Sequence, residues 1–259
     1  MKSEYETDGF VFRPGLLDAA EIAVLVDELE RVLVDEPHDE RFILERDGVT
    51  VRTVANLHQR SMVYDHLVHH PLLLDAASDL LDDDVYVFQL GVNCKAAFNG
   101  DAWFWHQDFP GYREDDHIPA PRMVNTLIFL DEVMSTNGPL MLVPGSHRHV
   151  AATPAVTDGG TSYSFRYADT ETIKEQVRVG GVVAPTGPPG SVIFMNVNTL
   201  HGSTGNMSPW PRRMITVTFN AMSNKATSPS VRPRHIVGDD RDATALIPMD
   251  AGCLMELAR

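Results

Sequence analysis

Hydrophobic residues recur at two spacings along the chain, and the first spacing predicts helices near the N-terminus. Six apolar residues follow a helical spacing between positions 19 and 35: Ile22, Leu25, Val26, Leu29, Val32 and Leu33. This spacing places them on one helix face, and Asp18 with Glu21 forms a capping box in front of them. The pattern predicts a helix over 19–35 that packs on the outside of a sheet, and residues 72–81 predict a second, shorter helix.

The second spacing predicts strands. From Val85 almost to Asn220, short apolar runs are separated by Gly and Pro turns, which is typical of a sandwich or barrel and not of alternating strands and helices. Residues 127–130 and 140–143 predict core strands, and residues 213–220 alternate apolar with polar side chains, as in a half-buried strand. Asp47 and Gly48 predict a hairpin turn between residues 41–45 and 50–54, and a short strand is predicted over 9–13.

The chain shows no internal repeat and no break in composition that would mark a second domain. Its 259 residues are enough for one domain with a sizeable core. We expect a single domain over 1–259, in which N-terminal helices within about 16–82 pack on a barrel within about 85–222. Residues 223–259 would form a C-terminal tail.

Charge and cysteine content exclude some classes of function. The formal net charge of −15 argues against a nucleic-acid partner, which requires a basic patch. No apolar run is long enough to span a bilayer, and the acidic first residues do not resemble a signal peptide, so a cytoplasmic location without a membrane partner is expected. Cys94 and Cys253 lie too far apart in sequence to form a ligand pair, and we expect two free thiols.

Candidate chemistry lies in Trp103–Phe109, an aromatic run that predicts a strand. His106 and Asp108 are two residues apart, so they would project from the same face of that strand while Gln107 points away. They supply two members of the 2-His-1-carboxylate triad that binds non-haem Fe(II). His201, at the end of an apolar run, is a candidate for the third ligand, and Arg212 follows it by eleven residues.

These motifs, in this order and spacing, resemble the phytanoyl-CoA dioxygenase-like branch of the Fe(II)/2-oxoglutarate oxygenases. Within that branch the sequence is most similar to bacterial hydroxylases of free amino acids, such as leucine 5-hydroxylase, and of solutes such as ectoine. Five stretches carry the resemblance: Gln89–Lys95, Trp105–Phe109, Pro119–Arg122, Asn137–His147 and His201–Arg212. Together they span about half of the chain.

The resemblance implies an all-β core with flanking helices, folded as a double-stranded β-helix, that is, a cupin-like jelly-roll barrel that holds iron at its open end. His106, Asp108 and His201 would be the metal ligands and the catalytic centre, with 2-oxoglutarate and O2 as cosubstrates. Arg212 would form a bidentate pair with the far carboxylate of 2-oxoglutarate, which suits a guanidinium, and Ser203 would add a hydrogen bond.

The resemblance also implies the residues that surround the two organic molecules. Asn93 would lie near the inner carboxylate of 2-oxoglutarate, with Gln89 beside it or beside the substrate. Relatives border the substrate with the loop that corresponds to 110–122, which contains Tyr112, often Trp in those relatives, and Arg122. Further candidates are an arginine of the tail, Arg232 or Arg234, for a substrate carboxylate, and His58 with Arg52 in the hairpin region. For the last two, solvated loop residues are the more common case.

We therefore expect a hydroxylase that acts on an unactivated C–H bond of a small carboxylate-bearing substrate, foremost a free L-amino acid or a derivative. An ectoine-type solute or a natural-product intermediate is the alternative. The ligand set alone also fits a non-oxygenase metal-binding barrel or a Zn hydrolase. Arg212 argues against the hydrolase, which has no need of a buried guanidinium beyond the distal histidine. The polar stretch 150–178 is a candidate lid, and the sequence leaves open whether the protein is a monomer or a homodimer.

Overall fold

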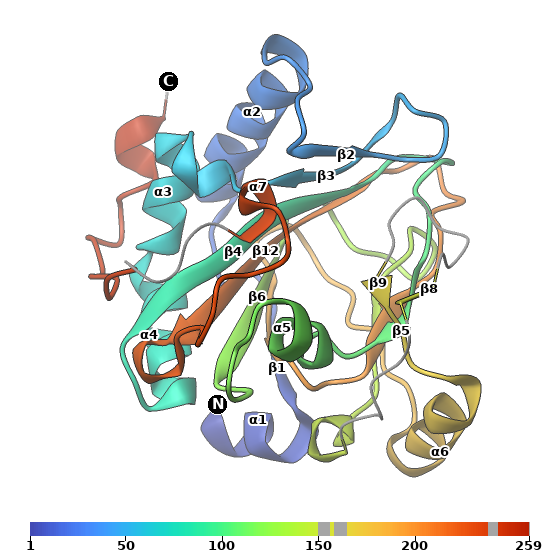
Figure 1. Cartoon of the computed structure of the whole chain (residues 1–259). Helices are drawn as coiled ribbons and strands as arrows, with labels where there is room; N and C mark the ends of the chain where they lie inside the picture. The colour runs from blue at the N-terminus through green and yellow to red at the C-terminus, as the bar shows by residue number, and fades with distance from the viewer. Residues whose placement is uncertain (150–155, 158–164, 238–242, 259) are drawn as a thin grey trace.

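The computed structural model describes residues 1–149, 156–157, 165–237 and 243–258. Its core consists of two antiparallel sheets that face each other (Figure 1). The larger sheet has seven strands in the order β1 (Phe10–Arg13), β10 (Val192–Asn196), β6 (Met123–Phe129), β12 (Arg212–Ala221), β4 (Val85–Lys95), β3 (Val51–Ala55) and β2 (Phe42–Leu44). The smaller sheet has the order β5 (Trp103–His106), β11 (His201–Ser203) and β7 (Leu140–Leu142), and β8 (Val156–Thr157) pairs with β9 (Phe165–Arg166). This is the expected all-β, jelly-roll core with flanking helices.

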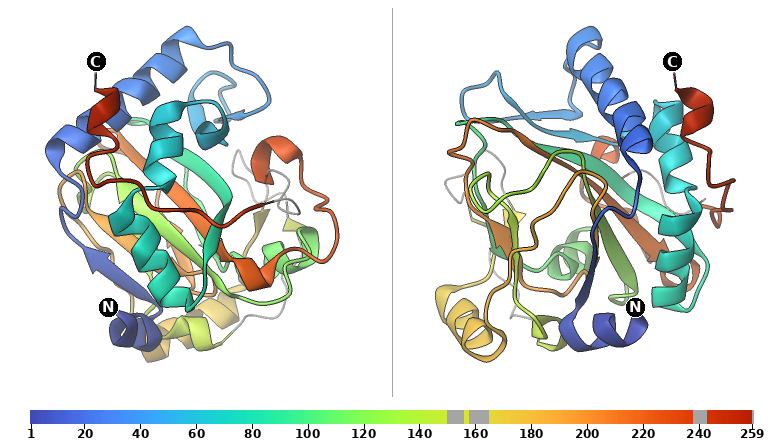
Figure 2. Two further views of the ribbon diagram at one scale, coloured as in Figure 1. Left: turned by 90° about the vertical axis from the view of Figure 1, so that its left-hand side faces the viewer. Right: turned by 180° about the vertical axis from the view of Figure 1, so that it is seen from behind.

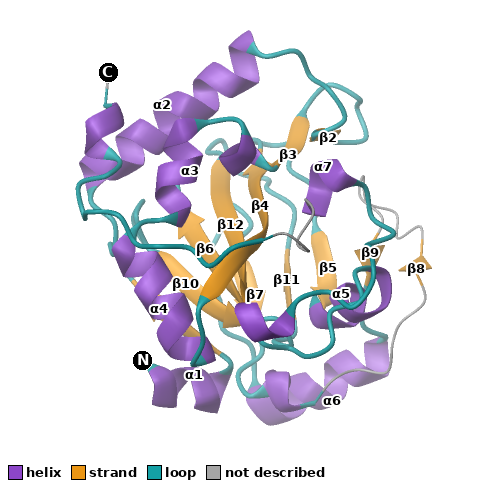
Figure 3. Ribbon diagram, turned by 60° about the vertical axis from the view of Figure 1, so that its left-hand side comes forward, coloured by secondary structure: helices purple, strands orange, loops and turns teal. Residues whose placement is uncertain are grey.

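Helices surround this core. Three of them, α2 (Ala19–Asp35), α3 (Met62–Val68) and α4 (Pro71–Leu81), cover the outer face of the larger sheet (Figure 3). The remaining helices are α1 (Lys2–Asp8), α5 (Phe109–Asp115), α6 (Thr170–Gly180) and α7 (Arg234–Val237), with 3-10 turns η1 (Leu57–Gln59), η2 (Ser146–Arg148), η3 (Met222–Asn224) and η4 (Met255–Leu257). Turning the molecule shows the C-terminal segment beside α2 and α3, on the side of the larger sheet away from the smaller one (Figure 2). Among the described residues no helix has the length and apolar character needed to cross a bilayer.

The faces of β4 and β12 differ in character. Ile215, Val217 and Phe219 of β12 point outward into the apolar core under the helices, as Val92 and Cys94 of β4 do. The polar residues between them face the space between the two sheets. Because helices cover one face and the second sheet covers the other, β12 is buried on both sides. The expectation of a half-buried strand was therefore wrong, although the alternation was read correctly.

Several predicted elements are confirmed and others need correction. The helix over 19–35, the helix over 72–81, the strand over 9–13 and the hairpin around Gly48 are present. The strand predicted over Trp103–Phe109 ends at His106, because Asp108 adopts a helical backbone and begins α5. The predicted loop 110–122 is therefore half helix. Within the candidate lid, residues 150–155 and 158–164 lie outside the described residues, and its described end contains the first part of α6.

The capping box of α2 offers a test of the local analysis. The Asp18 carboxylate accepts hydrogen bonds from the backbone N–H groups of Ala20 and Glu21, at 2.8 and 2.9 Å. Replacing Asp18 by Ala should lower the free energy of unfolding by about 1 kcal/mol, measured by urea denaturation. The control is Asp27→Ala, an exposed position of the same helix, which should have a smaller effect. Equal effects of the two substitutions would contradict the role of the cap.

Candidate metal and cosubstrate site

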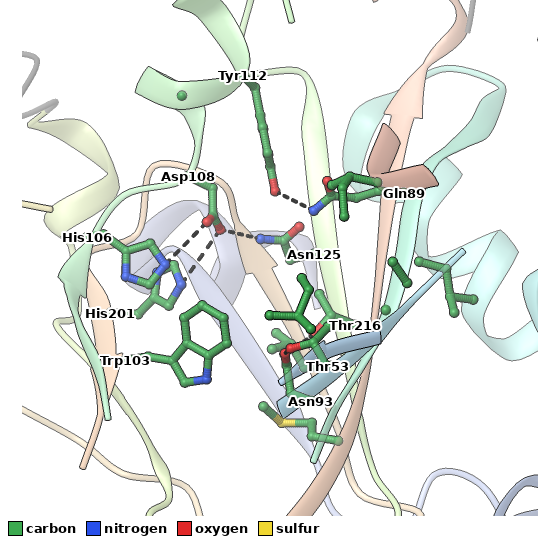
Figure 4. Close-up of a pocket in the computed structure, with 18 of the residues that line it drawn as sticks. Thr53, Gln89, Asn93, Trp103, His106, Asp108, Tyr112, Asn125, His201 and Thr216 are labelled. Carbon is green, nitrogen blue, oxygen red and sulfur yellow. Dashed lines mark hydrogen bonds and ion pairs between the residues drawn. The ribbon is translucent and has the colours of Figure 1, made fainter. Parts of the chain in front are cut away.

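A cavity of about 700 Å³ lies between the two sheets. The inward faces of β4, β6 and β12 form one wall, the smaller sheet forms the opposite wall, and α5 and α7 border it. Gln89, Asn93 and Thr216 reach into it from the larger sheet, opposite His106 and His201 (Figure 4). The cavity therefore brings together groups that are distant along the chain.

Strand pairing brings the two histidines together. In the antiparallel pair β5–β11, His201 is the direct partner of His106, and their ring centroids are 4.1 Å apart. The pairing is irregular between His201 and Ser203. A Cβ on Gly202 would lie 3.0 Å from the backbone oxygen of Trp103, so this close approach of the strands suits glycine.

The protonation of both imidazoles is fixed by backbone carbonyls. Nδ1 of His106 lies 2.7 Å from the oxygen of Phe104, and Nδ1 of His201 lies 2.9 Å from the oxygen of Thr199. Because a carbonyl oxygen can only accept, each Nδ1 carries the hydrogen and each Nε2 keeps its lone pair. Both Nε2 atoms face Asp108, His106 at 3.4 Å and His201 at 3.7 Å (Figure 4). Potential ligand atoms of the three residues lie within 4.8 Å of one another, the only such His, Cys, Asp or Glu group found in the described part of the chain.

Asp108 is held in place by hydrogen bonds. Asn125 of β6 donates to its Oδ2 at 2.6 Å, and Thr218 of β12 donates to Oδ1 of Asn125 at 2.7 Å. Burial by itself would raise the pKa of Asp108, but the neighbouring His201 and His106 rings and the Asn125 amide outweigh it and lower the pKa to about 2. Burial lowers the pKa of His201 to about 4, helped by His106. At neutral pH His201 is therefore a neutral imidazole and Asp108 a carboxylate. Together with Nε2 of His106 they form the two-histidine, one-carboxylate donor set that suits Fe(II).

A buried cation lies at the inner end of the cavity. Arg212 is 1% exposed, and its Nε and Nη2 both donate to the backbone oxygen of Gly138, at 3.1 and 2.9 Å. Burial lowers its pKa to about 10, so the guanidinium remains charged at neutral pH. Ser203, also on the cavity wall, has a buried Oγ without a hydrogen-bond partner among the described residues. A carboxylate placed here would satisfy both groups, which fits 2-oxoglutarate.

The other predicted cosubstrate residues also line the cavity. Asn93 accepts a hydrogen bond from Thr53 at 2.9 Å, and its amide lies 3.5 Å from Oγ1 of Thr216. Gln89 donates to the hydroxyl of Tyr112 at 3.0 Å, which ties β4 to α5 (Figure 4). Tyr112 is thus brought to the cavity as expected.

Three predicted substrate residues do not reach the cavity wall. Arg122 donates to the oxygen of Leu81 and to Asp83 at the surface. His58 lies in η1, half-buried, where burial lowers its pKa to about 4. Of the two tail arginines it is Arg232, not the exposed Arg234, that lines the cavity.

Two further arginines are fixed by acidic neighbours. Arg52 lies beneath the cavity wall, 4.0 Å from the ring of Trp103, and donates to the buried Glu45 at 3.1 Å. Arg213 lies on the face of β12 opposite to Arg212 and forms ion pairs with Asp131 and Glu30. Asn125 was not among the candidates, although a polar residue within the apolar run of β6 was a usable signal.

Comparison with known proteins identifies the family. The model of the phytanoyl-CoA dioxygenase (PhyH) family matches residues 5–214. An ectoine dioxygenase of Bordetella bronchiseptica is 36% identical over 97% of this chain and 85% of that protein, and an L-proline trans-4-hydroxylase of Streptomyces griseoviridis is 33% identical over 96% and 95%. The solved structure of EctD from S. alaskensis with bound Fe superposes with a TM-score of 0.84 at 30% identity, covering 96% of this chain and 85% of EctD, and its complex with 2-oxoglutarate and 5-hydroxyectoine with a TM-score of 0.81, covering 96% and 86%.

The chain belongs to the phytanoyl-CoA dioxygenase family. It is an iron- and 2-oxoglutarate-dependent dioxygenase that uses O2. This assignment replaces the two alternatives that the ligand set alone left open, a Zn hydrolase and a non-oxygenase metal-binding barrel.

The metal site can be tested without measuring turnover. Replacing Asp108 by Ala removes the only carboxylate of the candidate triad, and we expect Fe(II) affinity to fall by more than about 100-fold. Replacing Asn125 by Ala, which only orients Asp108, should cost about 10- to 100-fold. Both are measured by anaerobic titration against a competing chelator. Wild-type affinity in Asp108→Ala would refute the site.

Proposed function

We propose that this dioxygenase hydroxylates an unactivated C–H bond of ectoine or a closely similar small cyclic solute. The observation that carries the proposal is the match to ectoine dioxygenases over 97% of the chain, together with the fit to EctD in complex with 2-oxoglutarate and 5-hydroxyectoine. The sequence alone favoured a free L-amino acid, and these relatives favour the alternative.

We assign the inner half of the cavity to the metal and cosubstrate. His106 and His201 would bind Fe(II) through Nε2 and Asp108 through a carboxylate oxygen, leaving the side that faces the cavity open. Arg212 would hold the distal carboxylate of 2-oxoglutarate and Ser203 would donate to it, while Asn93 would lie near the inner carboxylate. Bound Fe(II) and 2-oxoglutarate supply the O2-derived oxidant that replaces the C–H hydrogen by hydroxyl.

We assign the outer half to the substrate. Arg232 lines it and lies 5.3 Å from the Tyr112 ring centroid and 5.8 Å from that of Phe88. Its Nη2 also donates to Gln89 at 3.3 Å. A guanidinium held in this way is suited to a carboxylate, such as the one that ectoine carries. The protein thereby orients the substrate so that one carbon faces the metal, which is the main requirement for this chemistry.

L-proline is the second candidate substrate. The chain covers 95% of the length of the L-proline trans-4-hydroxylase but 85% of the ectoine dioxygenase. Proline is also a small ring that bears a carboxylate and a cationic nitrogen. A natural-product intermediate has less support, because the matched enzymes of nogalamycin biosynthesis, at 20–22% identity, share the fold alone.

Substrate-dependent release of succinate tests the proposal. Purified enzyme with Fe(II) and 2-oxoglutarate is given ectoine, L-proline or L-leucine, and the hydroxylated product is identified by NMR. We expect ectoine to give the highest kcat/KM. Turnover of L-proline or L-leucine with none of ectoine would contradict the assignment to ectoine.

The proposed role of Arg212 predicts a specific kinetic change. Arg212→Lys keeps the charge but loses the paired donors, so KM for 2-oxoglutarate should rise about 10- to 100-fold, the size expected for one or two charged hydrogen bonds. KM for the organic substrate should change little. Arg213→Lys, on the opposite face of the strand, is the matched control. An unchanged KM for 2-oxoglutarate in Arg212→Lys would rule out this anchor.

A further inference from the structure

The C-terminal end of α5 carries two adjacent carboxylates, and each pairs with an arginine of the cavity wall. Asp116 binds Arg232 through both oxygens, at 2.9 Å to Nε and 2.6 Å to Nη2. Asp115 binds Arg166, at 2.9 Å to Nη2 and 3.4 Å to Nε. Arg232 and Arg166 come from segments more than sixty residues apart, and both line the cavity.

The two carboxylates differ in their access to the cavity. The Asp116 side chain is 1% exposed and is not part of the cavity wall; it also accepts a hydrogen bond from Ser230 at 2.5 Å. The Asp115 side chain is 27% exposed and does line the cavity. Asp116 therefore holds Arg232 in place, whereas Asp115 itself faces the space where a substrate would lie.

The carboxylate of Asp115 has capacity for a further donor. An ionised carboxylate offers about four acceptor positions, and the described hydrogen bonds from Arg166 use one on each oxygen. Arg166 holds these oxygens in a fixed geometry without filling them.

The charges of the outer half of the cavity balance. Arg232 is offset by Asp116, and Arg166 by Asp115 and, at 3.6 Å, by Glu114, which Arg113 offsets in turn at 3.5 Å, so these six described side chains sum to zero. A ligand that brings a net charge into this enclosed space would leave it uncompensated, which is costly away from water. A net-neutral ligand with separated positive and negative groups avoids that cost.

We propose that Asp115 binds the cationic nitrogen of the substrate while Arg232 binds its carboxylate, so that the site selects net-neutral zwitterions. This inference rests on the proposed function, and it adds Asp115 as a specificity-determining residue. The cation is the amidinium of ectoine or the ring ammonium of L-proline. Arg166 is a positioning residue that orients Asp115.

A pair of ligands of equal shape isolates the contribution of the cation. L-proline and (S)-tetrahydrofuran-2-carboxylate differ in the ring nitrogen, which is an uncharged oxygen in the second compound. Their binding, and that of ectoine, is measured by anaerobic calorimetry on the enzyme loaded with Fe(II) and 2-oxoglutarate, where no turnover occurs. The variant is Asp115→Asn. The control is Glu171→Gln, which removes the same charge from an exposed residue of α6 outside the cavity wall.

In the wild type we expect both zwitterions to bind more tightly than the oxygen analogue. Asp115→Asn should weaken ectoine and L-proline by about 10-fold or more and leave the oxygen analogue within about twofold. Glu171→Gln should leave all three within about twofold, and KM for 2-oxoglutarate should not change in either variant. Wild-type affinity for both zwitterions in Asp115→Asn would overturn the inference while leaving the proposed function intact. A wild-type enzyme that binds neither ectoine nor L-proline would instead refute the proposed function.

A second variant keeps the test decisive if Asp115→Asn does not fold. Asp115→Ser removes the carboxylate but keeps a small polar side chain, and it should likewise lose the preference for L-proline over its oxygen analogue. A wild-type preference in Asp115→Ser would overturn the role of Asp115.

Discussion

The pairing of β11 with β5 is the constraint on which the site depends. It places His201 directly opposite His106, two residues that lie far apart in the sequence, with ring centroids 4.1 Å apart. The carbonyls of Phe104 and Thr199 then turn each Nε2 toward Asp108. A shift of one residue in this pairing would send the two side chains to opposite faces of the sheet. The geometry of the proposed metal site therefore depends on the register of the β5–β11 pair.

The larger sheet supplies the remainder of the site, because one of its faces packs under the helices and the other lines the cavity. On β4 and β12 the outward residues are apolar and pack under α2, α3 and α4, which holds the strands rigid. The inward residues are then available for chemistry, and they include Asn93 and Arg212. Burying a guanidinium costs free energy unless an anion accompanies it. A bound dicarboxylate would offset this cost at Arg212.

The sequence predicted the elements whose signals are local. The capping box defined the start of α2, and the alternation in β12 defined which residues share a face. The triad and Arg212 came from family resemblance and spacing, because the contacts that unite them are between distant strands. The strand expected through Asp108 was wrong because tertiary packing begins α5 there, with the N–H of Asp108 bonded to Val197. The arginines of the outer cavity could not be paired with Asp115 and Asp116 from spacing alone, since those contacts depend on how distant segments return to α5.

Helix α5 begins next to one functional group and ends next to others. Asp108 immediately precedes it, and Asp115 and Asp116 stand at its end. At 1.5 Å per residue, the helix separates these positions by about 10 to 12 Å. It therefore sets a fixed separation between Asp108 of the proposed metal site and the carboxylates at its C-terminal end. The length of α5 would determine which carbon of a bound molecule comes within reach of the oxidant. The position of hydroxylation would then follow from the number of residues in one short helix.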